Sequence, residues 1–162
     1  MTSFVSHTSV DCADAYALSE WWKQVLGYID LPDDPNSPGD PECMIVEPMP
    51  SRKSPTRSPS PGVSPASEQS TGGFSGSTAD HGHRVLFIEV PEPKTVKNRM
   101  HFDLRPGTGS RDDEVERVLA LGATLVADHR GITGPGTGWV VLADPEGNEF
   151  CILRSPAELA TN

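Results

Sequence analysis

The sequence Gly138-Trp139-Val140-Val141-Leu142-Ala143-Asp144-Pro145-Glu146-Gly147-Asn148-Glu149-Phe150-Cys151-Ile152-Leu153 predicts a β-hairpin near the end of the chain. Two runs rich in β-branched and apolar residues, WVVLA and EFCIL, flank the turn DPEGN. Proline presets φ at the first central position of a type I turn, and Gly147 can supply the left-handed residue that closes a bulge. We therefore expect two paired strands joined at 144–148.

Upstream of the hairpin, the same order of elements occurs twice. The first unit is a strand over 4–10, a helix that begins after Asp14 and stops at Gly27, and strands at 28–31, 43–47 and 83–90. After a linker at 91–97, the second unit has a strand over 99–104, a helix capped by Ser110, a strand over 123–127 and the hairpin. A unit of strand, helix and three strands is too small to bury its own sheet, so we expect the two copies to pack together or with another subunit.

The first helix carries Trp21 and Trp22 side by side. Trp22 belongs to the apolar stripe formed with Leu18 and Val25, which predicts that it faces the core. Adjacent helix residues point in different directions, so Trp21 is expected at a rim or interface instead.

Composition limits the classes of partner. The chain has 162 residues and a formal net charge of −10, which argues against nucleic acid and anionic membranes as partners. No apolar run reaches the ~20 residues of a membrane span, and the first residues lack the pattern of a secretion signal. Cys12, Cys43 and Cys151 show no CxxC spacing, so a reduced, cytoplasmic protein is expected.

Residues 48–82 differ from the rest, because they consist mostly of Ser, Pro, Gly and Thr. Such a segment has little to bury and is expected to be a disordered insertion in a hairpin loop. Its Ser-Pro pairs beside basic residues could be phosphorylation or docking sites, although a tolerated surface insertion is the simpler interpretation.

The DPEGN turn before a short apolar strand, together with the repeated βαβββ unit, resembles the vicinal-oxygen-chelate superfamily, which includes glyoxalase I, bleomycin-resistance proteins and extradiol dioxygenases. The resemblance implies an α+β fold in which two tandem βαβββ modules form a cup-shaped mixed or antiparallel sheet. It implies a single glyoxalase-like domain over 1–156, with module one at 1–92, module two at 97–156 and a tail at 157–162.

The resemblance also implies metal-ligand positions at His7, Glu89, His101 and Cys151. Cys151 stands where metal-dependent members carry a glutamate. Two imidazoles and a carboxylate would suit one divalent Zn, Ni, Fe or Mn ion, and a site without metal is equally open. Each residue also has a structural interpretation: a hydrogen-bonded core histidine, a carboxylate paired with arginine or water, or a small buried thiol.

Other residues are candidates for contact with a small-molecule ligand. Asp103 and Arg105 share a strand face with His101, and Trp139 could stack on a flat ligand or pack in the core. Asp103 or Glu149 would be the proton acceptor if the protein is an enzyme.

The resemblance implies lyase, isomerase or dioxygenase chemistry on a small organic ligand. The alternative is a metal-free, ligand-sequestering dimer of the bleomycin-resistance type, and a homodimer is expected in either case. A third interpretation is an interaction module that acts through the Ser/Pro segment.

Overall fold

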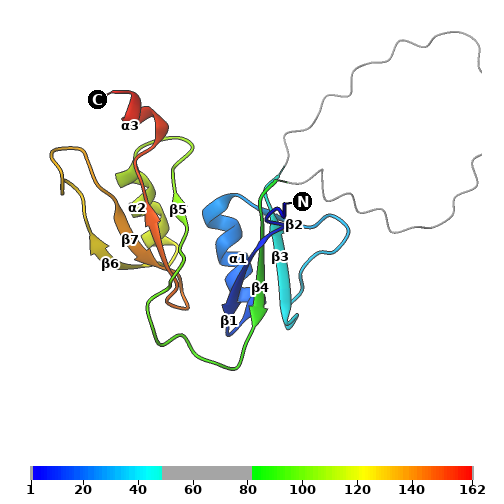
Figure 1. The fold of residues 1–162 in the computed structure, drawn as a ribbon. Helices are drawn as coiled ribbons and strands as arrows, with labels where there is room; N and C mark the ends of the chain where they lie inside the picture. The colour runs from blue at the N-terminus through cyan, green and yellow to red at the C-terminus, as the bar shows by residue number, and fades with distance from the viewer. Residues whose placement is uncertain (1, 49–81, 162) are drawn as a thin grey trace, which may run out of the picture.

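The computed structural model describes residues 2–48 and 82–161, so residues 49–81 of the predicted insertion, with their Ser-Pro pairs, lie outside the described part. The first module contains β1 (Thr8–Cys12), α1 (Ala15–Leu26), β2 (Ile29–Asp30), β3 (Glu42–Val46) and β4 (Arg84–Glu89). Its sheet has the order β1-β4-β3-β2, with β1 parallel to β4 and the other pairs antiparallel (Figure 1).

The second module repeats this pattern. It contains β5 (Asp103–Leu104), α2 (Arg111–Ala120), β6 (Thr124–Asp128), β7 (Val140–Ala143) and β8 (Glu149–Ile152), and a short helix α3 (Pro156–Ala160) follows. The sheet order is β5-β8-β7-β6, and again the first and last strands are parallel. The predicted α+β fold of two tandem βαβββ modules is confirmed.

Local chemistry explains where the elements begin and end. The Asp14 side chain accepts a hydrogen bond from the Ala17 amide at 2.8 Å, and Gly27 ends α1 with φ of 69°. Ser110 and Asp113 form the predicted capping box of α2. In the closing hairpin, the Gly147 amide donates to the Asp144 carbonyl at 2.9 Å, as a tight turn requires.

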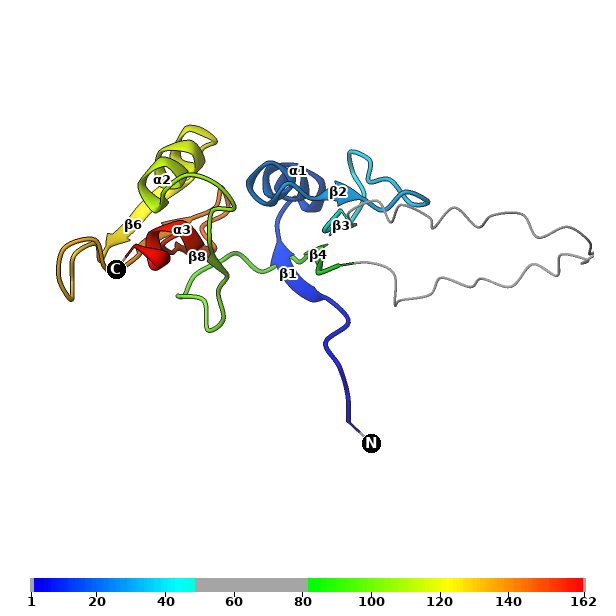
Figure 2. The same ribbon diagram turned by 90° about the horizontal axis from the view of Figure 1, so that it is seen from above.

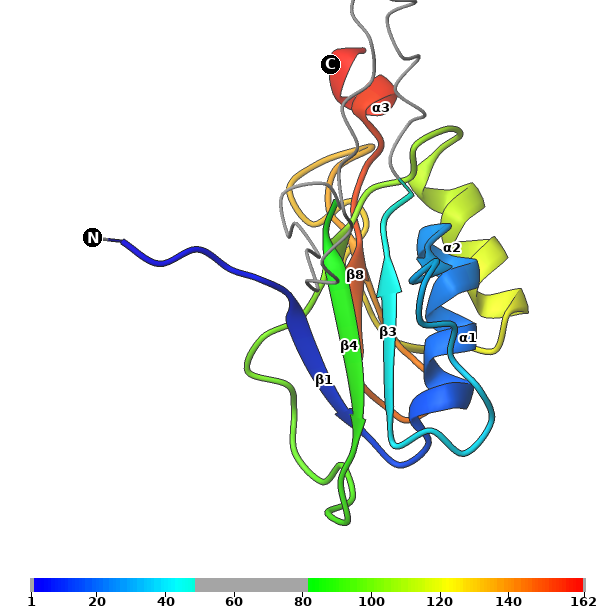
Figure 3. The same cartoon turned by 90° about the vertical axis from the view of Figure 1, so that its right-hand side faces the viewer.

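Both main helices lie on the same side of the molecule, and the opposite side of both sheets is left open by the described elements (Figures 2 and 3). Beneath α1 the first sheet buries Ile45, Val85 and Phe87, and the second sheet buries Leu142 and Phe150 on the same side. The uncovered face of each sheet is therefore the place where polar side chains can meet a ligand.

The modules share one core through the adjacent tryptophans of α1. Trp21 and Trp22 are both buried, and each ring packs edge-on against Phe150, with centroids 5.9 and 5.1 Å apart. Trp21 Nε1 donates to the Leu121 carbonyl at 2.9 Å, and Trp22 Nε1 donates to Asp144 at 3.1 Å. Trp21 lies at an interface as predicted but not at an exposed rim, because the second module covers the flank of α1.

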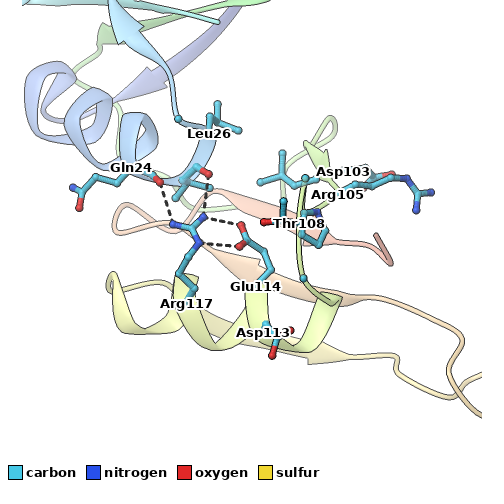
Figure 4. A pocket seen from close by; sticks show the side chains of 14 residues that line it. Gln24, Leu26, Asp103, Arg105, Thr108, Asp113, Glu114 and Arg117 are labelled. Carbon is cyan, nitrogen blue, oxygen red and sulfur yellow. Dashed lines mark hydrogen bonds and ion pairs between the residues drawn. The ribbon is translucent and has the colours of Figure 1, made fainter. Parts of the chain in front are cut away.

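Arg117 on α2 adds a polar link between the modules. Its guanidinium donates to the Gln24 carbonyl at 3.1 Å and to the Val25 carbonyl at 3.0 Å, while it pairs with Glu114 (Figure 4). These carbonyls belong to the last turn of α1, where free acceptors and the negative end of the helix dipole favour a cation.

None of the helices in the described ranges is long and apolar enough to cross a membrane.

Candidate functional site

The site is built on the open face of the second sheet. Along β8, Phe150 and Ile152 point into the core, so Cys151 between them points to the other face. The strand register places Asp103 of β5 beside Cys151, and Cys151 beside Val141 of β7. Neighbouring strands thus bring a carboxylate, a thiol and an apolar floor together.

His101, just before β5, completes a cluster with Asp103 and Cys151. Each residue offers a ligand atom, and these three atoms lie within 4.8 Å of one another. His101 Nε2 is 3.3 Å from Asp103 Oδ1, and both side chains are about half exposed, whereas Cys151 is buried. An imidazole, a carboxylate and a thiol are a donor set for a divalent transition metal.

The Cys151 thiol is protonated at neutral pH in this arrangement. Burial, together with the nearby Asp103 carboxylate, raises the pKa of the thiol to about 11, although the positive charge of Lys97 opposes the rise. An inert neutral thiol is therefore expected until a cation binds, since a metal ligand must be the thiolate.

The cluster lies in a pocket of about 400 Å³. Val141 and Leu153 supply apolar surface, and Lys97, Asn98, His129 and Trp139 line the remaining sides. Trp139 is 36% exposed, and its ring lies 4.9 Å from the His129 ring, centroid to centroid. The close approach of the backbone at residue 138 to His129 requires glycine. A Cβ on Gly138, at its φ of 83°, would overlap the His129 carbonyl oxygen.

Glu149 lines the same pocket but is already engaged. Its Oε2 accepts hydrogen bonds from Lys94 Nζ at 2.9 Å and from the Asn98 amide at 3.0 Å. Burial alone would raise the pKa of this carboxyl, yet the bonds from Asn98 and Lys94 lower it below its ordinary value. Glu149 therefore also holds the segment between the modules against β8.

The structure does not bring His7 and Glu89 to this cluster. His7 precedes β1, where Thr8 pairs with Val85, and its Nδ1 lies 3.3 Å from Ser6 Oγ. Glu89 is at the opposite end of β4, paired with Cys12. Its Oε1 accepts from the Ala15 amide at 3.4 Å, so its side chain is on the side of the sheet that α1 covers.

Arg105 lines a different cavity. Its Nη1 donates to the Arg154 carbonyl at 2.5 Å. Together with Thr108, Asp113 and Glu114 it lines a cavity of about 860 Å³ between the end of α1 and the start of α2 (Figure 4). Asp103 of β5 lines both cavities. Arg105 lines only the larger cavity and therefore lies outside the metal-ligand cluster.

Lys97, Asn98 and His129 also line the pocket and were not predicted from the sequence. His129 could have been found from the hairpin register, because Asp128 pairs with Val140 and the next residues on each strand are His129 and Trp139. Lys97 and Asn98 belong to an irregular linker, whose path no periodic pattern indicates.

Comparison with solved structures supports the fold. The chain resembles a mutant of the fosfomycin resistance protein FosX from Listeria monocytogenes, in complex with Mn(II) and 1S,2S-dihydroxypropylphosphonic acid, with TM-score 0.57 and 14% identity over 98% of this chain and 94% of that one. FosX from Mesorhizobium loti gives TM-score 0.55 and 13% identity over the full length of both chains. A possible glyoxalase from Bacillus cereus gives 0.52 and 11%, over 94% of this chain and 99% of that one.

No curated protein matches the sequence. The family profile described as "Glyoxalase-like domain" matches residues 7–153, which span both modules and the whole cluster. The resemblance inferred from the DPEGN turn and the repeated unit is thereby confirmed, and the chain belongs to the glyoxalase-like domain family of the vicinal-oxygen-chelate superfamily.

Proposed function

We propose that the pocket on the second sheet is a metal site and that the protein is a metal-dependent enzyme acting on a small molecule with neighbouring oxygen atoms. The observation that carries the proposal is the convergence of three ligand atoms within 4.8 Å inside a pocket. The FosX neighbour was solved in complex with Mn(II), which supports metal binding by a protein of this fold.

The donor set fits a divalent transition metal. His101, Asp103 and Cys151 would hold it and leave coordination positions for a ligand, the pattern of catalytic rather than structural sites. A thiolate is a soft ligand, which favours zinc over manganese. The sequence predicted a carboxylate ligand at Glu89 and a proton acceptor at Asp103 or Glu149, whereas we now propose Asp103 as the carboxylate ligand.

When bound, the metal supplies Lewis-acid polarisation of a substrate oxygen. Glu149 is the remaining carboxylate of the pocket, and we assign it the role of proton acceptor. Lys94 and Asn98 both bond to Oε2, and Oε1 accepts no hydrogen bond from another side chain or amide in the described ranges. The carboxylate is ionised at neutral pH and can accept a proton directly, and its lowered pKa makes it a weaker base than an ordinary glutamate. Lyase, isomerase and dioxygenase reactions remain the expected classes.

The test is the metal content of untagged protein purified without chelator, measured by elemental mass spectrometry. We expect about one transition metal per chain, with at least about fivefold less in His101→Ala and in Cys151→Ser. His129→Ala is the matched control, since it removes an imidazole from the same pocket but outside the cluster. Metal-free wild-type protein, or equal metal in all variants, would contradict the proposal and favour the metal-free binding alternative.

Two further variants separate this cluster from the ligand set implied by the sequence. His7→Ala and Glu89→Gln are both expected to retain the metal, because neither residue reaches the cluster within one chain. Loss of metal in His7→Ala alone would instead indicate a site completed by His7 of a second copy.

We also propose a homodimer. The open face of the first sheet carries the half-buried apolar residues Met44, Leu86 and Ile88, which share one side by strand register and are covered by neither α1 nor α2. Light scattering after size exclusion should give about twice the 17.4 kDa chain mass, and Leu86→Glu should reduce it toward the monomer. A wild-type mass of one chain would contradict the dimer.

A further inference from the structure

The pocket has an aromatic wall that metal binding does not require. Trp139 and His129 lie with ring centroids 4.9 Å apart and planes tilted by 41°, and Trp139 leaves 36% of its surface exposed. Buried aromatic rings usually serve packing, but this indole lines a concave site that also holds polar groups. Such a surface suits a flat ring, which gains both apolar burial and ring stacking.

A positive charge stands on the same pocket. Lys97 lines it and lies close enough to Cys151 for its charge to act on the thiol. The nearby Lys94 is occupied by Glu149, whereas Lys97 makes no ion pair or hydrogen bond within residues 2–48 and 82–161. An ammonium group with three donors and no protein acceptor there can bind an anion.

Local charge supports an anionic ligand even though the whole chain is acidic. This step rests on the proposed function, because a divalent metal would be balanced by the Asp103 carboxylate and the Cys151 thiolate. Glu149 is balanced by Lys94. Lys97 then remains as an uncompensated positive charge at the pocket, within a chain of net charge −10.

We propose that the pocket binds a small planar aromatic acid. The ring lies against Trp139 and His129, and the carboxylate meets Lys97. A hydroxyl group on the ring, ortho to the carboxylate, points to the cluster of His101, Asp103 and Cys151. The pocket volume of about 400 Å³ accommodates one such ring and is at the small end of the range for ligand sites.

Calorimetric titration of the full chain with three probes tests the proposal. 2-Hydroxybenzoate has both the ring and the carboxylate, phenol lacks the carboxylate, and lactate is a hydroxy acid without the ring. We expect 2-hydroxybenzoate to bind at least about tenfold more tightly than either of the others. Absence of 2-hydroxybenzoate binding at about millimolar concentration, or equal binding of lactate, overturns the proposal.

Variants assign the binding to these residues. Lys97→Gln and Trp139→Leu should each weaken 2-hydroxybenzoate binding about tenfold, while circular dichroism and metal content stay those of the wild type. Arg99→Gln is the charge control, because Arg99 is exposed and does not line this pocket. Equal affinity in Lys97→Gln and Arg99→Gln overturns the inference.

The same samples separate this inference from the metal proposal. Protein without metal that still binds 2-hydroxybenzoate through Lys97 and Trp139 would support the ligand class and contradict the metal site. Protein that holds metal but binds 2-hydroxybenzoate equally well without Lys97 or Trp139 would support the metal site and contradict the ligand class.

Discussion

Asp144, the first residue of the DPEGN turn, is the one buried carboxylate in the described ranges. It is 2% exposed and accepts from Trp22 Nε1 at 3.1 Å, from the Glu146 amide at 3.0 Å and from the Asn148 amide at 2.9 Å. A buried carboxylate persists only when donors replace its lost hydration. This residue therefore ties the turn of the second module to the helix of the first.

Asp144→Ala should lower the free energy of unfolding by about 3 kcal/mol, since it leaves the buried Trp22 indole N–H and the half-buried amides of Glu146 and Asn148 without their acceptor. Asp144→Asn should cost less, because one acceptor oxygen remains. Urea denaturation at neutral pH measures both. Asp33→Ala is the control, since Asp33 is exposed, and it should change stability by less than about 0.5 kcal/mol. A similar loss in both alanine variants would contradict the role of Asp144.

At this scale the sequence predicted part of the candidate site. His101, Asp103, Glu149, Cys151 and Trp139 were selected, and all of them line one pocket. Face alternation on adjacent strands is a local rule, so their convergence could be foreseen. Lys97 was not predicted because it lies on an irregular linker, where backbone path rather than periodicity decides the direction of a side chain. His129 carried a weak signal, because the register of β6 and β7 continues to place it opposite Trp139.

At the scale of elements, capping chemistry predicted both ends of α1 and the start of α2, but α3 was not anticipated. Ser155 and Glu158 form a capping box, with Ser155 accepting from the Glu158 amide and Glu158 accepting from the Ser155 amide. The sequence Ser-Pro-Ala-Glu carries that signal, although a helix of five residues leaves no apolar stripe to detect. Glu158 also accepts from the Arg111 amide at 2.8 Å and so joins α3 to the start of α2.

Glu158 should make stability depend on pH in the acidic range. Burial would raise the pKa of its carboxyl, but hydrogen bonds from the Ser155 and Arg111 amides lower it below the ordinary 4.5. A lowered folded-state pKa means that the carboxylate stabilises the fold above the unfolded pKa and loses this effect as pH falls through the folded pKa. The free energy of unfolding of the wild type should exceed that of Glu158→Gln by about 1 kcal/mol at pH 7, and this difference should shrink as the pH falls below 4.5. Denaturation curves at pH 7 and at acidic pH test this, and a difference that does not shrink in acid would contradict it.

Arg117 gives a second prediction at this scale. Arg117→Ala should lower the free energy of unfolding by about 1–2 kcal/mol, since two carbonyls at the end of α1 lose their donor. Arg117→Lys should retain only part of this stabilisation, because an ammonium group cannot reproduce the planar arrangement of donors on a guanidinium. Arg130→Ala is the matched control, since Arg130 pairs with Asp112 and Asp128 inside one module. This variant should lower the free energy of unfolding by less than Arg117→Ala does. Thermal denaturation ranks the three variants.

At the scale of the whole molecule, the repeat predicted that the two modules depend on each other, but only the structure shows how. Helix periodicity treats α1 as a cylinder with one apolar face, which is why Trp21 and Trp22 were expected in different environments. The second module adds a covering surface on the flank of α1, formed by Phe150 and the Leu121 carbonyl, and so both indoles are buried. Contacts between modules are set by tertiary packing, for which the sequence of one helix carries no periodic signal.

The shared core predicts that both modules unfold as one unit. Trp22→Phe removes the indole donor to Asp144 and part of the packing on Phe102 and Phe150, which should cost about 2 kcal/mol. Native-state hydrogen exchange reports β3 and β4 separately from β7 and β8, and the slowest amides in both sheets should lose protection by the same free energy. Val126→Ala, at a side chain 52% exposed, should leave both sheets unchanged. Loss of protection confined to the first sheet would contradict this prediction and would mean that the two modules unfold independently.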